Sequence, residues 1–141
     1  MLERDPILMQ ILSLVYLIYF LLLFWEVMAF LLKPSYINLD IIFGALAGYF
    51  LLIEISVFLF QFQFYQDPSS ISNIDTTNPA KTYIDLVYFS TIVQTSIGFG
   101  DIAPATHNTK LATAFLGLMG QFYSVVLIGI LLSKFSASQK E

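Results

Sequence analysis

This chain of 141 residues is poor in the residue types on which most functional sites depend. It has no cysteine, which excludes disulfides, thiolate catalysis and cysteine-bound metals. It has a single histidine, His107, so a transition-metal site built from several imidazoles is not expected. Only 11% of its residues are charged, against about 25% in an average soluble domain. Six basic residues within a net charge of -4 provide no basic surface for nucleic acid.

Long apolar segments dominate the chain, and 57% of its residues are hydrophobic. No charged residue interrupts residues 6–25 or 111–133, and only Glu54 interrupts residues 41–62. At 1.5 Å per residue, each segment can cross a hydrocarbon core about 30 Å thick. We therefore predict a single-domain, all-α membrane protein. Its transmembrane helices are expected at residues 6–32, 41–65 and 109–135.

The segments between these helices differ in character. Residues 33–40 form a short connector, in which Pro34 is expected to end the first helix and Asp40 to cap the second. Residues 66–81 hold most of the turn-forming residues and are predicted to form an exposed loop. Residues 82–95 fit a helix only about 20 Å long, which is too short to cross. The chain must then turn back inside the membrane, where irregular backbone is tolerated only if it is buried in protein or lines a watery cavity.

The turn after this short helix reads Thr-Ser-Ile-Gly-Phe-Gly-Asp, at residues 95–101. Successive carbonyls can face one axis only if the backbone alternates between right- and left-handed dihedral angles, which ordinary strands do not do. Glycine adopts the left-handed steps without a steric penalty, and Gly98 and Gly100 are spaced two apart, as the alternation requires. Carbonyls arranged in this way can replace the hydration shell of a cation. The pattern therefore predicts a cation-selectivity filter at residues 96–101.

These residues resemble the pore module of potassium channels, in which the filter reads Thr-Val-Gly-Tyr-Gly-Asp. The likeness covers roughly residues 41–135, is closest to small viral and prokaryotic channels, and leaves the first helix as an addition. In that family residues 66–81 would be the extracellular turret and residues 82–95 the pore helix. The resemblance implies potassium coordination by Ser96, Ile97, Gly98 and Phe99, with Gly100 and Asp101 forming the outer mouth of the filter.

The resemblance also implies a tetrameric pore. One filter segment per chain cannot make a ring of carbonyls, so the expected partners are three further copies of the chain, together with membrane lipids and no nucleic acid. Potassium ions in the filter are the expected cofactor, with no organic cofactor and no catalytic residues. The expected location is a plasma or cell membrane, and a viral origin is compatible with the likeness.

The last helix is expected to line the conduction path. Gly120 lies 20 residues after Gly100, at the position of the hinge glycine in the channels that the chain resembles. Polar and then apolar residues follow it on one helix face, at spacings that suit a wet cavity narrowing to a hydrophobic constriction. These cavity residues are Gln121, Ser124, Ile128 and Leu132.

Several side chains around the filter have more than one interpretation. Glu54 is a carboxyl inside a spanning segment, and we weigh a pH sensor or a brace behind the pore helix against an acid without a role. His107 could tune conduction by protonation, but a solvated loop histidine without that role is the better fit to the sequence. Phe99 replaces the family's tyrosine and is expected to wedge against Tyr88 and Phe89. The family's buried acid behind the filter is replaced by Ile92.

Aromatic residues at the end of the second helix are expected to form a belt at the outer membrane surface, namely Phe60, Phe62, Phe64 and Tyr65.

Three functions other than a potassium-selective channel are also compatible with the sequence. The substituted filter is compatible with a weakly selective cation channel. A transporter subunit with related pore loops is disfavoured by the two filter glycines in one loop. A non-conducting membrane scaffold is the third. Arg4 is the only arginine, so no ladder of voltage-sensing charges is present.

Overall fold

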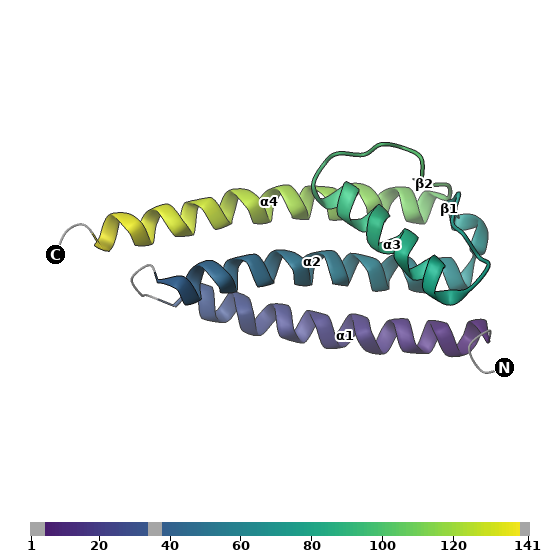
Figure 1. Ribbon diagram of the computed structural model, residues 1–141, viewed down its shortest axis with the longest axis horizontal. Coiled ribbons are helices and arrows are strands. Elements are labelled where there is room, and N and C mark those ends of the chain that lie inside the picture. The colour runs from purple at the N-terminus through teal and green to yellow at the C-terminus, as the bar shows by residue number, and fades with distance from the viewer. Residues whose placement is uncertain (1–4, 34–37, 139–141) are drawn as a thin grey trace.

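The structure is a computed structural model that describes residues 5–33 and 38–138, and it consists almost entirely of helix (Figure 1). The elements in chain order are α1 (Pro6–Leu31), α2 (Leu39–Gln66), a one-turn 3-10 helix (Pro68–Ser70), β1 (Ile71–Ser72), α3 (Pro79–Gln94), β2 (Ala103–Pro104) and α4 (His107–Ser138). Among the described residues, three helices are long and apolar enough to cross a membrane: α1, α2 and the part of α4 from His107 to Leu132. The predicted all-α fold with three candidate spans is confirmed.

The start of α2 is set by Asn38, a cap that the sequence pattern does not predict. The Asn38 side chain accepts a hydrogen bond from the Ile41 amide at 2.9 Å and caps the helix. The prediction that Asp40 provides the cap is wrong, because Asp40 already lies inside the first turn, where its charge suits the helix dipole. Pro34, which was expected to end the first helix, lies outside the described residues.

Capping also moves the starts of α3 and α4 from their predicted positions. Asn78 accepts a hydrogen bond from the Lys81 amide at 2.9 Å, and Pro79 occupies the first helical position, so α3 begins at residue 79 rather than 82. Thr106 and Thr109 exchange hydrogen bonds between their side chains and amides, which resembles a capping box. As a result, α4 begins at residue 107 rather than 109 and continues to 138 rather than 135.

The main core lies where α2, α3 and α4 meet. Val57, Phe60 and Leu86 have no exposed surface, and the rings of Phe60 and Phe89 are 4.9 Å apart. The predicted aromatic belt is therefore wrong for Phe60 and Phe64, which are buried in this core rather than placed at a membrane surface. Their rings instead fix the position of the short helix α3 against α2.

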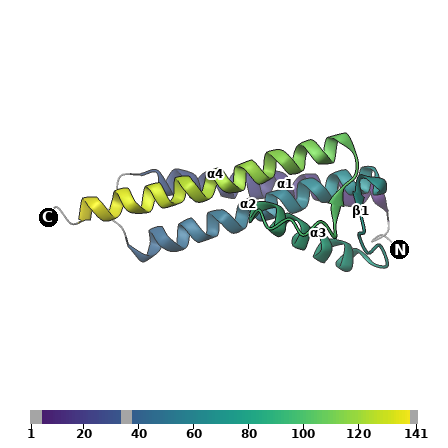
Figure 2. The same ribbon diagram turned by 90° about the horizontal axis from the view of Figure 1, so that it is seen from above.

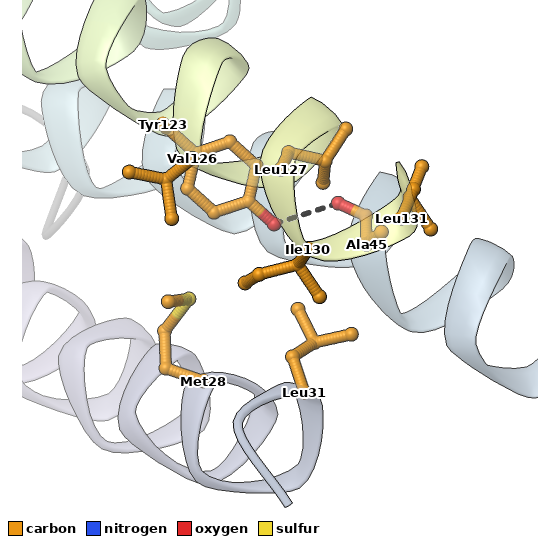
Figure 3. A pocket seen from close by; sticks show the side chains of 8 residues that line it. All are labelled: Met28, Leu31, Ala45, Tyr123, Val126, Leu127, Ile130 and Leu131. Atoms are coloured by element: carbon orange, nitrogen blue, oxygen red, sulfur yellow. Dashed lines mark hydrogen bonds between the residues drawn. The ribbon is translucent and has the colours of Figure 1, made fainter. Parts of the chain in front are cut away.

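Helix α1 is peripheral, because only 6% of its most apolar stretch is buried inside the chain, against 50% for the same kind of stretch in α2. Toward its N-terminal half, the rings of Tyr16 and Phe20 stack on Phe58 of α2 at 5.0 and 5.5 Å. Toward its C-terminal end, α1 borders a small apolar pocket that also includes residues of α2 and α4 (Figure 3). There the Tyr123 hydroxyl of α4 donates to the Ala45 carbonyl of α2 at 2.7 Å.

A missing side chain permits this contact between α2 and α4. A Cβ at Gly48 would collide with the Tyr123 hydroxyl, so only glycine admits the ring at that point. Gly44, four residues earlier, has its closest neighbours in Phe30 and Leu31 of α1. The two small residues thus serve two different interfaces, one to α4 and one to α1.

The short helix α3 is slanted across α2 and α4, and the chain after it loops back to β2, beside β1 (Figure 1). Figure 2 shows α3 set to one side of the long helices. The start of α1 lies at the same end of the molecule as β1 and β2, whereas α4 ends at the opposite end (Figure 1). The chain thus enters from the β1–β2 end along α3 and returns to that end, which is the path predicted for a re-entrant segment.

Candidate functional site

The loop after α3 is held on one side by main-chain hydrogen bonds. The Ser96 amide donates to the Val93 carbonyl at 3.1 Å, while the Ile97 and Gly98 amides both donate to the Ile92 carbonyl, at 2.9 and 3.1 Å. Three successive N–H groups are thus turned toward the C-terminal end of α3. Among the described residues, no donor reaches the carbonyls of residues 96–99. Those carbonyls therefore remain available to another partner.

The backbone of this loop alternates in handedness. Gly98 and Gly100 have φ angles of 56° and 81°, in the left-handed region that the glycine pattern predicts. Ser96 also has a positive φ, of 58°, which the pattern does not predict. Left-handed backbone costs a residue with a side chain roughly 1–2 kcal/mol. Positive φ angles at residues 96, 98 and 100 give the period of two that places consecutive carbonyls on one side.

The outer end of the loop is fixed by Asp101. The Tyr88 hydroxyl of α3 donates to the Asp101 carboxylate at 2.8 Å, and the Asn73 side chain donates to the Asp101 carbonyl at 2.7 Å. The Tyr88 hydroxyl lowers the pKa of that carboxyl, because it stabilises the charged form. The sequence pattern predicts Tyr88 only as a contact of Phe99, and it does not predict that Tyr88 or Asn73 binds Asp101. Tyr88 lies four residues before Ile92, on the same face of α3, and that spacing was the available signal.

A short antiparallel ladder joins the loop of residues 66–81 to the outer end. Ile71 pairs with Pro104 and Ser72 with Ala103, and the Ser72 hydroxyl also donates to the Ala103 carbonyl at 3.0 Å. The Ser70 carbonyl accepts hydrogen bonds from the Ala105 amide at 2.8 Å and from the Thr109 hydroxyl at 2.7 Å. These bonds tie the exposed loop to both the returning chain and the start of α4.

The exposed loop is itself closed by a charged pair. Hydrogen bonds from Thr77 and then from the Lys81 ammonium, 3.0 Å away, lower the pKa of Asp75 to about 2. The Asp75 amide donates to the Asp85 carboxylate at 2.7 Å. The loop is therefore anchored on the first turns of α3 as well as on β2.

The inner end of the loop rests on Gln94, which is completely buried. Its side-chain amide donates to the Ser56 hydroxyl of α2 at 2.6 Å, and its carbonyl accepts from the Tyr49 hydroxyl at 3.1 Å. A Cβ at Gly120 of α4 would collide with both the side chain and the carbonyl of Gln94. Gly120 lies in an unbroken helix, and its missing side chain lets α4 approach the end of α3.

Of the residues expected to line the conduction path, one reaches the loop. The Gln121 side chain donates to the Ser96 hydroxyl at 2.6 Å. The Ser124 hydroxyl instead donates to the Gly120 carbonyl of its own helix at 3.0 Å. Ile128 and Leu132 are exposed further along α4. The structure thus joins Gln121 to the loop, and it leaves Ser124 partly buried and Ile128 and Leu132 exposed on the single chain.

Comparison with known proteins agrees with this geometry. Residues 41–137 match a family model described as "Ion channel". The chain belongs to this ion-channel family. It is an integral membrane protein and not an enzyme, and its resemblance to a potassium-channel pore is confirmed at the level of the family.

The channel also resembles a curated relative, the potassium channel protein kcv of Paramecium bursaria Chlorella virus 1. The two are 41% identical over 44 residues, which make up 30% of this chain. The matched segment spans about half of the relative, at 47% of its length. No solved structure gave a significant match.

The remaining predicted residues of the channel lie around the loop in different settings. Glu54 of α2 accepts a hydrogen bond from the Tyr83 hydroxyl of α3 at 3.2 Å, so it has a partner on the short helix. His107 is exposed at the first residue of α4. Phe99 is 72% exposed, so within one chain it does not wedge against Tyr88 and Phe89 as predicted. The Phe89 ring packs against Phe60 in the core, so it is not available to contact Phe99 as predicted.

Proposed function

We propose that this channel is potassium-selective and conducts dehydrated ions past the carbonyls of Ser96, Ile97, Gly98 and Phe99. The observation that carries the proposal is the alternating backbone of residues 96–100: the amides of residues 96–98 turn toward α3, and no donor among the described residues reaches the carbonyls of residues 96–99. A row of such carbonyls replaces the hydration shell of an ion. Gly100 and Asp101 form the outer mouth, and Asp101 is braced there by Tyr88.

The proposed functional unit is a homotetramer. Unpaired carbonyls cannot face hydrocarbon, because a polar group without a partner is strongly disfavoured there. The loop of the single chain is exposed throughout, with Ile97 at 55% and Phe99 at 72%. Four copies around one axis would enclose the loops and bring their carbonyls into rings. In this arrangement Phe99 packs against a neighbouring copy instead of its own α3.

Potassium rather than another cation is favoured by the sequence of the loop and by the relative, a viral protein named as a potassium channel. The membrane of action would be a plasma or cell membrane. The test is the reversal potential of the purified channel in lipid bilayers with potassium on one side and sodium on the other. A sodium-to-potassium permeability ratio well below one supports the proposal, and a ratio near one identifies a weakly selective cation channel instead.

The control for this test is Gly98→Ala. Apart from the two adjoining residues, no atom of the described residues lies within 4 Å of a Cβ at this position, so within one chain the substitution acts through the backbone, at a φ of 56°. The strain of roughly 1–2 kcal/mol falls on every copy in the ring, so we expect flux to be lost while the assembled protein persists. Absence of flux in the wild type would favour a non-conducting scaffold.

A further inference from the structure

One polar hydrogen bond joins the side chain of an α4 residue to the loop. Gln121 is exposed, yet its side-chain amide donates a hydrogen bond of 2.6 Å to the Ser96 hydroxyl. Ser96 is the innermost residue of the alternating backbone and has a left-handed φ of 58°. The contact therefore connects a helix that crosses the membrane with the first oxygen that an ion would meet from the inner side.

The approach that makes this contact possible depends on the preceding residue. Gly120 lies against Gln94, where a Cβ would collide with the Gln94 carbonyl and side chain. Gln94 is itself held by Ser56 and Tyr49 of α2. The backbone of α4 is thus set at a close distance from the base of the loop, and the next residue, Gln121, projects its amide to Ser96.

We propose that Gln121 is a positioning residue that sets ion selectivity by orienting the Ser96 hydroxyl, an inference that rests on the potassium channel proposed above. A serine hydroxyl has one donor hydrogen and two acceptor lone pairs. The Gln121 amide occupies one lone pair, which fixes the rotation of the hydroxyl and leaves one lone pair for an ion. Without the amide, the hydroxyl turns freely, and the ring of four hydroxyls can close on a smaller ion.

The contact can be tested with Gln121→Met, which keeps the length of the side chain and removes the donor. We expect the sodium-to-potassium permeability ratio to rise about fivefold, the factor that one net hydrogen bond is worth. Size-exclusion chromatography of the variant checks that the four-chain assembly is intact before the ratio is measured. Gln121→Leu provides a second variant that lacks the donor.

A double-mutant cycle separates this mechanism from a general change in the polarity of the cavity. If Gln121 acts through the Ser96 hydroxyl, Gln121→Met should change the ratio less than twofold once Ser96→Ala is present. It should keep its full effect with Ser96→Thr, which retains a hydroxyl. Ser124→Ala is the matched control, because it removes a polar group from the same helix whose one hydrogen bond within the described residues goes to the Gly120 carbonyl. Its effect should add to that of Ser96→Ala.

The outcomes distinguish the two proposals. A selective wild type in which the effects of Gln121→Met and Ser96→Ala simply add overturns the positioning role and leaves the potassium channel standing. A change in current or stability without any change in the permeability ratio overturns it as well, since that is what a structural role would produce. A wild type without selectivity overturns both.

Discussion

The two ends of the loop at residues 96–101 are held by different kinds of contact. At the outer end, the hydrogen bonds that Tyr88 and Asn73 make to Asp101 are exposed, and the β1–β2 ladder ties the returning chain to the loop of residues 66–81. At the inner end, the support is neutral and buried, because Gln94 is enclosed by α2 and α4.

This difference implies that the two ends respond to different perturbations. A buried contact between helices is sensitive to volume and to lost hydrogen bonds, since the surroundings can neither relax fully nor admit water. An exposed carboxylate is sensitive instead to protonation, and its contribution is screened by solvent. Changes in side-chain size should therefore disturb the inner end most, and acid should disturb the outer end.

The largest expected effect comes from Gly120→Ala at the inner end. The added Cβ meets the Gln94 backbone carbonyl as well as its side chain, so α4 must shift away from α3. Overpacking of this kind costs about 1–3 kcal/mol in each chain, and we expect conduction to be lost. The measurements are single-channel recording and the thermal unfolding midpoint in detergent.

The matched control is Gly129→Ala on the same helix, where a Cβ would have no neighbour within 4 Å in the described part of the chain beyond the helix's own backbone. It should conduct normally and gain about 0.5–1 kcal/mol from helix propensity. If Gly120 served only as a hinge, Gly120→Ala would also stabilise the resting protein. Stabilisation by both variants would therefore contradict the close contact with Gln94.

A smaller effect is expected from Ser56→Ala, which removes the partner of the Gln94 amide. The other polar atom of that side chain, Oε1, is buried and already lacks a partner among the described residues, so the substitution leaves the whole amide unpaired. We expect a loss of about 1–2 kcal/mol in stability together with a lower open probability. Denaturant unfolding would measure the loss of stability, and single-channel recording would measure the open probability.

Ser13→Ala is the control for this substitution. Ser13 and Ser56 are both completely buried, and each donates to the carbonyl four residues earlier in its own helix. Only Ser56 also accepts a hydrogen bond from a second helix. Equal losses in the two variants would show that burial of the hydroxyl, and not the link to Gln94, determines the effect.

The contrast between the two ends also explains how far the sequence could predict this molecule. Long apolar segments and the two filter glycines follow from composition and spacing, and they were sufficient to predict three spans, a re-entrant chain and the positive φ angles at Gly98 and Gly100. These features depend on a residue's own chemistry. They need no knowledge of which helix faces which.

The supports of the loop could not be predicted in the same way, because each joins residues far apart in the chain. Gln94 and Ser56 are 38 residues apart, and Asp101 and Asn73 are 28 apart. Phe60 was assigned to a membrane surface because its aromatic ring suits an interface, and only the packing of α3 on α2 buries it. The type of a polar residue does not indicate which distant residue will be its hydrogen-bond partner in the folded chain.

The smallest expected effect is a shift in acid sensitivity at the outer end, produced by Tyr88→Phe. The Tyr88 hydroxyl lowers the pKa of Asp101 below the ordinary aspartate value of about 3.9, so the negative charge at the outer mouth is fully present above that pH and is lost as the pH falls through the lowered pKa. Without the hydroxyl, the pKa of Asp101 returns toward its ordinary value, and loss of current should begin at a higher external pH. Titration of the current with acid on the outer side measures the shift. Asp101→Asn removes the titrating group, so this acid-dependent step should vanish in it, and an unchanged step would place the acid sensitivity on another residue.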